Sequence, residues 1–362
     1  MIIVLFIVFF FLILRFVVTL FNFISNPKLH KVARQHHELV SVLIPARNEE
    51  SNILTLLQSI ETQDYQDYEV IVLDDDSSDQ TYAICEAFMA GRSRFQVIKG
   101  EPLKDDWLGK NYACYQLARQ ARGRYFLFLD ADEKVYKGLL NSAVHRMQVQ
   151  RLALLSLFTN QVMRTIGERM VVPLMHYVLL NLLPVRLIYI AKNYAVAAAS
   201  GQFMLFDATI YRQQQWHQQS RNRVVEDVEI MKLVKAEGYS GEGLLANGLI
   251  ACRMYTGYRD AINGFSKNFL AAFNYSIPGF IFYMLLLIGG PLLVFATLNV
   301  PLIVMMCGLI ILTRIMISLS SGQNAWYNVV LHPLQMLSLA VIGYYAIQNH
   351  FTRNTMWKGR RV

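Results

Sequence analysis

The chain opens with an apolar run, Met1 to Ile24, in which Arg15 is the only charged residue. A helix needs about 20 apolar residues to cross a bilayer, so this run is long enough to span one. It has no basic start, short apolar core or small-residue cleavage site of a secretory signal peptide, which predicts an uncleaved anchor at residues 1–24. The basic residues Lys28, Lys31 and Arg34 follow it and favour a cytoplasmic position for the next domain.

The other end of the chain is also apolar, and a membrane region is expected at residues 279–348. It contains three candidate spans, which are Phe280 to Leu298, Leu302 to Leu319 and about Trp326 to Ile347. The tail, residues 349–362, is basic and is therefore also expected in the cytoplasm. Because three full crossings would put this tail on the opposite side, one stretch is expected to be re-entrant or interfacial. These features predict an integral protein of the cell membrane.

Composition and charge fit this interpretation. The chain is 54% hydrophobic and only 17% charged, which is unusual for a soluble protein. The net charge is +8, but the basic residues flank apolar segments and form no aromatic-interleaved stripe, so anionic membrane lipids are the expected partner and nucleic acid is not. The four cysteines form no CxxC or Cys/His cluster, and neither a disulfide framework nor a zinc site is indicated.

The middle of the chain alternates between strand and helix patterns, which predicts an α/β domain at residues 38–270 with a mostly parallel sheet covered on both faces. The expected strands are Val40 to Pro45, Tyr68 to Leu73, Phe95 to Ile98 and Arg124 to Leu129, and the expected helices include residues 53–60, 79–90 and 110–121. In such sheets, ligands bind beyond the carboxyl ends of the strands.

Acidic residues follow two of these strands. Asp74 to Asp76 come after the second strand, and Asp130 and Asp132 come after a later one, so both groups are expected at one crevice. In extended backbone, residues i and i+2 point to the same side, which lets the carboxylates of Asp130 and Asp132 converge on one cation. This pattern indicates a nucleotide that is bound together with a divalent metal ion.

Several motifs then identify a likeness to membrane-bound family 2 glycosyltransferases. The motifs are SVLIPARNEE (41–50), VLDDDSSDQT (72–81), WLGKNYA (107–113), FLDAD (128–132), SGQFMLF (200–206) and VVEDVEI (224–230). Within that family the chain resembles carotenoid-type and hopanoid-type lipid glycosyltransferases, through RMY (253–255), GFSKN (264–268) and WKGR (357–360). The likeness covers most of the chain and implies a GT-A type nucleotide-diphospho-sugar transferase domain with N- and C-terminal transmembrane helices.

The resemblance also implies site residues. Around the nucleotide-sugar it places Pro45, Ala46, Arg47, Glu49, Asp75 or Asp76, Lys110 and Asp130. Most members of the family have Gly or Asn at the position of Asp76, which leaves open which of the acids binds the nucleotide. Asp130 and Asp132 match the DxD motif that holds Mg²⁺ or Mn²⁺. For Lys110, an ordinary surface lysine is an equal alternative.

Asp227, with Glu226 as the next candidate, matches the catalytic base of the family, and Gly201 and Gln202 match the acceptor site. The first turn of a helix also favours acids through its dipole, so composition alone does not distinguish the two roles of residues 226 and 227. The Q-x-x-R-W motif of processive synthases is absent, which favours transfer of a single sugar.

The expected reaction is therefore an inverting transfer of one hexose, with glucose the first candidate, from a UDP-sugar to a lipophilic acceptor. Two alternatives remain: a polyprenyl-phosphate sugar synthase, and a non-catalytic membrane module with a transferase-like domain. Residues 170–200 are too apolar for a solvent loop but are broken by Pro173, Pro184, Arg186 and Lys192. This segment is expected to lie in the membrane interface and to deliver the acceptor, with a helical hairpin against the sheet as the alternative.

Overall fold

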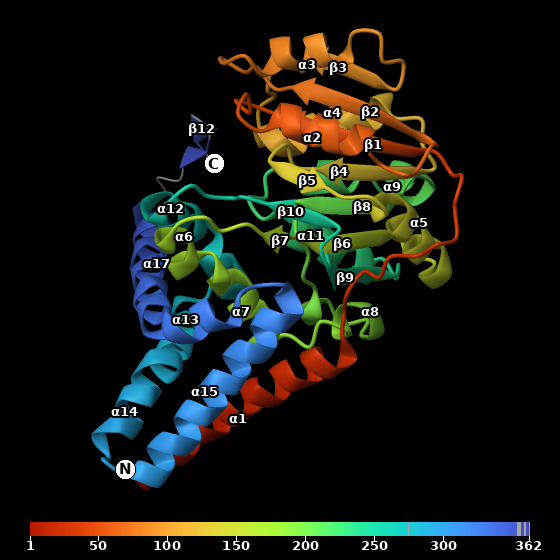
Figure 1. Ribbon diagram of the computed structural model, residues 1–362. Coiled ribbons are helices and arrows are strands. Elements are labelled where there is room, and N and C mark those ends of the chain that lie inside the picture. Colours follow the sequence, from red (N-terminus) through yellow and green to blue (C-terminus); the bar gives the residue numbers. More distant parts are fainter. Residues whose placement is uncertain (274, 353–355, 358–359, 362) are drawn as a thin grey trace.

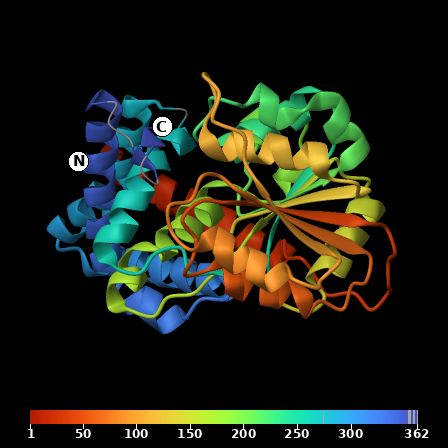
Figure 2. The ribbon, with the colours of Figure 1, turned by 90° about the horizontal axis from the view of Figure 1, so that it is seen from above.

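The computed structural model describes residues 1–273, 275–352, 356–357 and 360–361. Figures 1 and 2 show a sheet-centred domain and, beside it, a group of helices. The carboxyl-terminal pair β11 (Met356–Trp357) and β12 (Arg360–Arg361) lies near α12 (Tyr258–Asn268). The rest of the predicted basic tail, residues 353–355, 358–359 and 362, lies outside the described residues.

The main sheet has seven strands in the order β3-β2-β1-β4-β8-β6-β9. All of them run parallel except β8, which is antiparallel to β4 and β6. This confirms the mostly parallel sheet. The strands are β1 (Val40–Ala46), β2 (Tyr68–Asp74), β3 (Phe95–Lys99), β4 (Tyr125–Leu129), β6 (Leu154–Phe158), β8 (Phe203–Asp207) and β9 (Gly241–Leu245).

Helices cover both faces of the sheet because alternate side chains of each buried strand point in opposite directions. On β1, Val42 and Ile44 face one cluster of buried residues while Leu43 faces the other. The first face is covered by α2 (Ile53–Glu61), α3 (Thr81–Met89) and α5 (Leu139–Gln150). The second is covered by α4 (Gly109–Gln120), α9 (Ala208–Gln214), α10 (Trp216–Gln219) and α11 (Glu226–Ala236).

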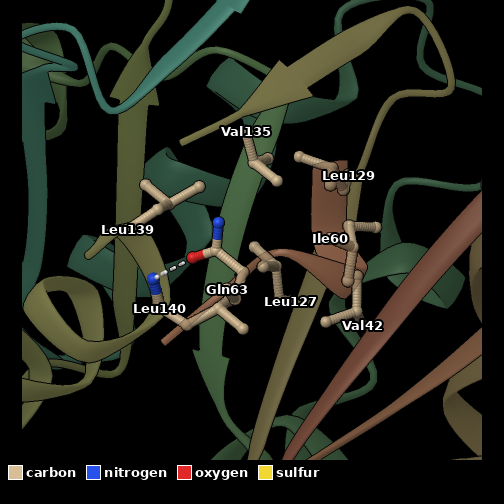
Figure 3. Close-up of a pocket in the computed structure, with 8 residues that line it drawn as sticks. All are labelled: Val42, Ile60, Gln63, Leu127, Leu129, Val135, Leu139 and Leu140. Atoms are coloured by element: carbon tan, nitrogen blue, oxygen red, sulfur yellow. Dashed lines mark hydrogen bonds between the residues drawn. The ribbon is translucent and has the colours of Figure 1, made fainter. Parts of the chain in front are cut away.

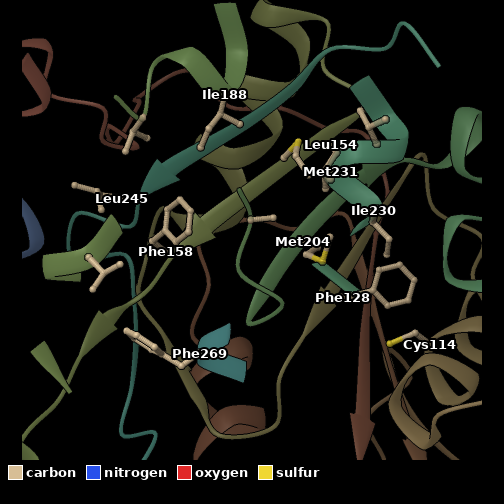
Figure 4. Packing of buried hydrophobic residues seen from close by; sticks show 14 of the residues in the cluster. Cys114, Phe128, Leu154, Phe158, Ile188, Met204, Ile230, Met231, Leu245 and Phe269 are labelled. Atoms are coloured by element: carbon tan, nitrogen blue, oxygen red, sulfur yellow. The ribbon is translucent and has the colours of Figure 1, made fainter. Parts of the chain in front are cut away.

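The two faces are packed differently in detail. Figure 4 shows the second face, where Cys114 of α4, Phe128 of β4, Met204 of β8 and Ile230 of α11 pack together. On the first face a small apolar cavity remains between the sheet, α2 and α5, and Figure 3 shows its lining, in which Gln63 is the one polar side chain. The backbone N–H of Leu140 donates to Gln63 Oε1 across this cavity at 3.5 Å. Since its walls are core side chains, the cavity belongs to the packing and not to the site.

A second, smaller sheet lies beside the carboxyl end of β4. It has the order β5-β10-β7, formed by β5 (Glu133–Val135), β10 (Ile250–Cys252) and β7 (Asn160–Gln161). β5 begins directly after the DxD motif, and it pairs antiparallel with β10 so that Glu133 lies opposite Cys252. The chain therefore turns sharply at Asp132 and brings residues from 120 positions away to the site.

Three helices of the described residues are long and apolar enough to cross a membrane: Ile2–Ser25, Ile277–Ala296 and Val300–Ser321. The first is α1, the third is α15 (Val300–Ser321), and the second consists of α13 (Ile277–Met284), η3 (Leu285–Gly289) and α14 (Gly290–Ala296). In Figure 1, α1, α14 and α15 project together from the domain. Val8 of α1 packs against Gly290 at the start of α14, where a Cβ would be only 3.0 Å from a Val8 methyl group.

The third C-terminal span expected at about residues 326–347 is not among these helices. That stretch forms α16 (Ala325–Val330) and α17 (His332–Thr352), and α17 packs beside α12 (Tyr258–Asn268) and α6 (Ile166–Val171). Its buried face carries the polar side chains Gln335 and Ser338, which bond to groups of α6 and α12 rather than facing lipid. This agrees with the expectation that one of the three stretches does not cross.

Residues 170–200 form short pieces, as the prolines predict: α7 (Pro173–Leu182), α8 (Leu187–Ile190) and η1 (Tyr194–Val196). One face of α7 is buried against α1 and α15. The exposed apolar side chains of the segment are Leu182, Tyr189, Ile190 and Tyr194. The chain after α1 also holds to the domain, because Leu29 N–H donates to the carbonyl of Leu245 at the end of β9. The remaining element, η2 (Phe269–Phe273), connects α12 to α13.

Candidate active site

The acidic loop after β2 is fastened to the loop after β1. Asp75 N–H donates to the Ala46 carbonyl at 2.8 Å, and the Arg47 guanidinium donates to the carbonyls of Asp75 and Asp76. Asp75 is buried, whereas the Asp76 side chain is 87% exposed and its backbone has φ of +57°. Arg47 therefore shapes the loop itself, in addition to any contact that it makes with a nucleotide.

The first acid of the loop, Asp74, helps to hold the loop in place. Asp74 is the last residue of β2 and is buried, and one of its carboxylate oxygens accepts a bond of 3.4 Å from Ser77 N–H. Two further bonds join the loops, from Ser78 N–H to Asn48 Oδ1 and from Gln80 N–H to the Glu50 carboxylate. These bonds hold the loop rigid, which is what a nucleotide-binding surface requires.

Asp130 and Asp132 follow β4, at the same edge of the sheet as the acidic loop, because β4 pairs with β1 and β1 with β2. The backbone N–H of Asp130 donates to the Gln202 carbonyl, at 3.2 Å. Lys110 Nζ lies 2.8 Å from Asp130 Oδ1 and 3.2 Å from Glu226 Oε1. Lys110 is thus no surface lysine, and that alternative is wrong.

The local sequence explains how Lys110 reaches this position. It lies in the first turn of α4, and the next residue, Asn111, is buried and donates to the carbonyls of Ser220 and Arg223 at 2.9 and 3.1 Å. These bonds dock the start of α4 on the loop that leads into α11. Burial opposes the charge of Lys110, but Asp130 and Glu226 hold its pKa well above the usual value, so the lysine stays cationic.

Asp227 lies in the first turn of α11, as the motif predicts. Its Oδ2 accepts a hydrogen bond of 2.8 Å from Gly201 N–H. Burial raises the pKa of Asp227 to about 7, and repulsion from Glu226 adds to this, while Lys110 and the hydrogen bond from Gly201 oppose it. A carboxylate with a pKa near 7 can take and release a proton at neutral pH.

Gly201 is required by the close approach of three charged groups. A Cβ at this position would lie 3.1 Å from Lys110 Nζ, 3.3 Å from Glu226 Oε1 and 3.5 Å from Asp227 Oδ2. The side chain of Gln202, in contrast, is buried and accepts a bond of 2.8 Å from Thr159 Oγ1. Of the two residues expected at the acceptor, Gly201 lies beside Asp227. Gln202 instead holds the backbone of Asp130, because its carbonyl accepts the hydrogen bond from Asp130 N–H.

Two residues of the site were not predicted, Glu133 and Cys252. Cys252 Sγ lies 3.3 Å from Asp132 Oδ2, and ligand atoms of Asp132, Glu133 and Cys252 all lie within 4.8 Å of one another. Glu133 is 1% exposed, and among the described residues neither of its carboxylate oxygens has a hydrogen-bond partner. A lone cysteine far along the chain gives no sequence signal of this proximity, since the pairing of β5 with β10 creates it.

The electrostatics of this corner are those of crowded acids. Burial raises the pKa of Asp132 to about 6, with further repulsion from Asp130 and Glu49. Burial and the neighbouring Asp132 carboxylate likewise raise the pKa of Glu133 well above its usual value. Acids that are buried without a cation are costly, so the group of Asp132, Glu133 and Cys252, with Asp130 near it in the chain, fits a divalent metal ion.

Comparison with known proteins agrees with this geometry. Residues 41–213 match the model of glycosyl transferase family 2. The 4,4'-diaponeurosporenoate glycosyltransferase of Staphylococcus haemolyticus (strain JCSC1435) is 24% identical over 281 residues, which are 73% of this chain and 69% of that protein. The protein of the same name from Staphylococcus aureus (strain MRSA252) is 33% identical over 121 residues, but the match spans only 31% of its length.

The fold also matches a solved structure, the mannosyltransferase PcManGT from Pyrobaculum calidifontis in complex with GDP-Man and Mn²⁺. The TM-score is 0.57, the sequence identity is 15%, and the match covers 96% of this chain and 99% of the other. The matching family model covers six of the seven strands of the main sheet, all but β9, and it includes the site residues other than Glu226, Asp227 and Cys252. Residues 41–213 of the chain thus form a glycosyl transferase family 2 domain, and the fold is of the GT-A type.

Proposed function

We propose that this enzyme transfers one hexose, with glucose the first candidate, from a UDP-sugar to a lipophilic acceptor such as a carotenoid- or hopanoid-type lipid. The observation that carries the proposal is the convergence of Lys110, Asp130 and the Glu226–Asp227 pair around Gly201 at the carboxyl edge of the sheet. The names of the two staphylococcal relatives support the acceptor class. The solved mannosyltransferase binds GDP-Man, so a direct assay must compare UDP-sugars with GDP-sugars as donors for this enzyme.

The donor is proposed to lie between the loops after β1 and β2 and the DxD motif. Pro45 and Ala46 would line the base, with Arg47, Glu49 and the carboxylates of Asp75 or Asp76 around base and ribose. Of the two acids, Asp76 is the more accessible, because its side chain is 87% exposed. Lys110 would contact the diphosphate, since its charge is maintained by two carboxylates at one edge of the crevice.

Asp130 and Asp132 would hold Mg²⁺ or Mn²⁺, with Glu133 behind them. When bound, the ion offsets the charge that develops on the departing nucleoside diphosphate, a contribution of several kcal/mol. The two carboxylates and Lys110 also order the leaving group. In this proposal the anomeric carbon would face Gly201, which lies beside Asp227.

Asp227 is proposed as the general base, with Glu226 the second candidate. It would take the proton of an acceptor hydroxyl as that oxygen attacks the anomeric carbon opposite to the leaving diphosphate, so the configuration inverts. General base catalysis of this kind accelerates a reaction about 10²–10⁴-fold. If the acceptor is a carboxylate, it is already ionised near neutral pH, and Asp227 then positions it rather than deprotonating it.

The acceptor is proposed to approach from the membrane along residues 170–200. Along this segment the side chains of Leu182, Tyr189, Ile190 and Tyr194 are exposed, and so is Lys192. An apolar surface with a cationic rim is typical of segments in the bilayer interface. With one span before the domain and two after it, the domain and the carboxyl-terminal tail share one side, and the basic residues after α1 make this the cytoplasmic side.

The alternative of a polyprenyl-phosphate sugar synthase requires a cluster of cations for the acceptor phosphate near Asp227. Apart from Lys110, the ion pairs of the described residues place no cation beside Asp130, Glu226 or Asp227. A non-catalytic module would not need a carboxyl group with a raised pKa at Asp227, and such groups are typical of catalytic sites.

A direct assay tests the proposal. The purified protein would be incubated in lipid nanodiscs with UDP-glucose and Mn²⁺ and with either a carotenoid carboxylic acid, a hopanoid alcohol or a polyprenyl phosphate, and the lipids would be analysed by mass spectrometry. Addition of one hexose mass to one of the first two lipids is the expected result. Modification of only the polyprenyl phosphate, or of none of the three with any nucleotide sugar, would refute it.

A further inference from the structure

Two arginines lie inside the membrane-spanning helices. Arg15 is in the middle of α1 and is 4% exposed, and Arg314 is in α15 and is 1% exposed. At a rise of about 1.5 Å per residue, Arg15 lies about 15 Å from the end of α1 at Ser25, and Arg314 about 10 Å from the end of α15 at Ser321. Both of these helix ends adjoin the catalytic domain, so the two charges lie in the half of the bilayer next to it.

The two guanidinium groups converge on one aromatic ring. The centre of the Tyr177 ring in α7 lies 5.0 Å from the Arg15 guanidinium carbon and 4.4 Å from that of Arg314. A ring face attracts one cation, but it does not neutralise two that repel each other across it. The arrangement concentrates positive charge at the contact of α1, α7 and α15.

No carboxylate balances this charge. Over residues 1–273 and 275–352, none of the ion pairs involves Arg15 or Arg314. Arg314 is held by the carbonyl of Asn328 and the side-chain oxygen of Gln335. Arg15 Nε and Nη2, in contrast, are buried and have no hydrogen-bond partner in the described part of the chain. An arginine in this setting is costly and is typical of a functional site.

The surroundings of Arg15 offer further polar groups. A small cavity beside it is lined by Leu12, Tyr177, Leu309, Ile310 and Thr313, which come from α1, α7 and α15. Among the described residues, Tyr283 Oη and His332 Nδ1 also have no hydrogen-bond partner, and both residues are close enough to interact electrostatically with Arg15. Arg15 itself lines the cavity, and its unpartnered buried donors indicate a missing acceptor.

We propose that Arg15 and Arg314 form a binding site within the membrane for the oxyanion of a lipid, either a carboxylate or a phosphate. A planar guanidinium donates two parallel bonds to either group, and in a medium of low dielectric constant such bonds are strong. The apolar tail of the same lipid would lie along Leu12, Leu309 and Ile310, whose side chains already face the cavity. This site is separate from the sugar-transfer site and does not depend on the proposed function.

The test is direct lipid binding by the full-length protein, without any sugar donor. Purified protein in a neutral detergent would receive oleate, phosphatidylglycerol or the uncharged lipid diacylglycerol, and native mass spectrometry would measure the lipid retained. We expect retention of at least one of the two anionic lipids and not of diacylglycerol. Arg15→Gln and Arg314→Gln should each weaken retention by about tenfold or more, because a charge-assisted hydrogen bond is lost.

The matched control is Arg169→Gln. Arg169 also stacks on a tyrosine, with 3.9 Å from its guanidinium carbon to the centre of the Tyr327 ring, but it lies in α6, outside the spans. Its replacement should leave lipid retention unchanged. The proposal would be overturned if the wild type retained the anionic lipids no better than diacylglycerol. It would also be overturned if the Arg15 and Arg314 variants retained the anionic lipids as well as the wild type does.

A second measurement uses only the wild-type protein, so it tests the site even if the variants fail to fold. A fatty acid with a photoreactive diazirine near its carboxylate would be bound to the wild type and cross-linked, and the labelled peptides would be mapped. Labels on α1, α7 or α15 near Arg15 and Arg314 are expected, and labels confined to other segments would refute the site. Competition by oleate but not by phosphatidylglycerol would identify the ligand as a carboxylate, and the reverse would identify a phosphate.

Discussion

Lys110 Nζ lies 2.8 Å from Asp130 Oδ1, so a cation already occupies one side of the first DxD carboxylate. The same ammonium lies 3.2 Å from Glu226, which joins the DxD motif to the residue next to the proposed base. Lys110 therefore links the leaving-group side of the site to the acceptor side. A metal ion at Asp130 and Asp132 would share Asp130 with this lysine.

This relationship predicts the behaviour of Lys110→Met, which keeps the length of the side chain and removes its charge. Turnover should fall by about 10²-fold or more, because one cation that stabilises the departing diphosphate is lost. Affinity for Mn²⁺, measured by the electron paramagnetic resonance signal of the free ion, should not decrease, because the lysine competes for Asp130. Arg119→Met, at the other end of α4, is the control and should behave as the wild type. Full activity of Lys110→Met would refute the role.

Much of the fold was predictable from the pattern of apolar residues. Strands such as Val40–Ala46 and Tyr68–Asp74 are buried on both faces, so they appear in the sequence as nearly continuous apolar runs. The span predicted at about residues 326–347 was not confirmed, because apolar content alone cannot distinguish a helix that faces lipid from one such as α17, which packs beside α6 and α12.

The second prediction concerns the metal ion. Asp132→Asn should lose Mn²⁺ binding and UDP-sugar turnover together, because the amide replaces one of the charged ligands of the ion. A chelator in excess should have the same effect on the wild-type enzyme. Asp67→Asn is a suitable control, since Asp67 is paired with His37 away from the site. Full turnover of the wild type in excess chelator would contradict the prediction.

A third prediction extends the metal site to the two residues that were not foreseen. Cd²⁺ bound at Asp132 should also contact Cys252, which would produce the ultraviolet absorption of a cadmium–thiolate bond, and Cys252→Ser should abolish this band. Glu133→Gln should weaken Mn²⁺ binding by about 10–100-fold, as expected for a group that supports the ligands. Cys85→Ser, another buried cysteine, should leave both measurements unchanged. A cadmium band that persists in Cys252→Ser would assign it to another thiol.

The sequence predicted which residues belong to the site, but it did not predict all of their roles. The residues of the motifs were found because their types and order are distinctive, but the roles of Lys110 and Gln202 depend on three-dimensional contacts. Lys110 points inward because Asn111 docks its helix on residues 220–223, and Gln202 points into the core because Thr159 binds its side chain. Such long-range bonds have no local signal in the sequence.

The fourth prediction concerns Asp227 and pH. Its carboxylate is active when deprotonated, and its pKa is about 7, so kcat/KM should rise about tenfold per pH unit below 7 and level off above it. Asp227→Asn should retain nucleotide binding and lose turnover by about 10²–10⁴-fold. Glu229→Gln, in the same helix, is the control and should retain the pH profile. Unchanged turnover of Asp227→Asn would transfer the role to Glu226.

The same raised pKa has a consequence for stability. In the unfolded chain Asp227 titrates near its ordinary value of 3.8, so the fold favours the protonated form. Its contribution to the free energy of unfolding is fully present below that value and is lost as the pH rises to about 7. Asp132, with a pKa of about 6, acts in the same direction. In metal-free detergent solution, Asp227→Asn should therefore unfold with a weaker dependence on pH between about 4 and 7 than the wild type.

The last prediction concerns the proposed route of the acceptor along residues 170–200. Leu179 and Leu183 of this segment pack against the core, so replacing them would disturb folding. Leu182, Ile190 and Tyr194 are exposed instead, by 39%, 65% and 63% of their surface. Their joint replacement by serine removes apolar surface without opening the core.

If this surface receives the acceptor from the bilayer, the triple variant should lose turnover of a long-chain acceptor by about tenfold or more, because each buried apolar side chain contributes about 1.5–3 kcal/mol. Turnover of a short, water-soluble acceptor and hydrolysis of the UDP-sugar should persist, since Asp130 and Asp227 are untouched. Leu54→Ser, at an exposed leucine of α2, is the control on the opposite side of the domain. Equal losses with both acceptors would instead indicate that these residues support the fold, because a defect in the fold does not distinguish a lipid from a soluble substrate.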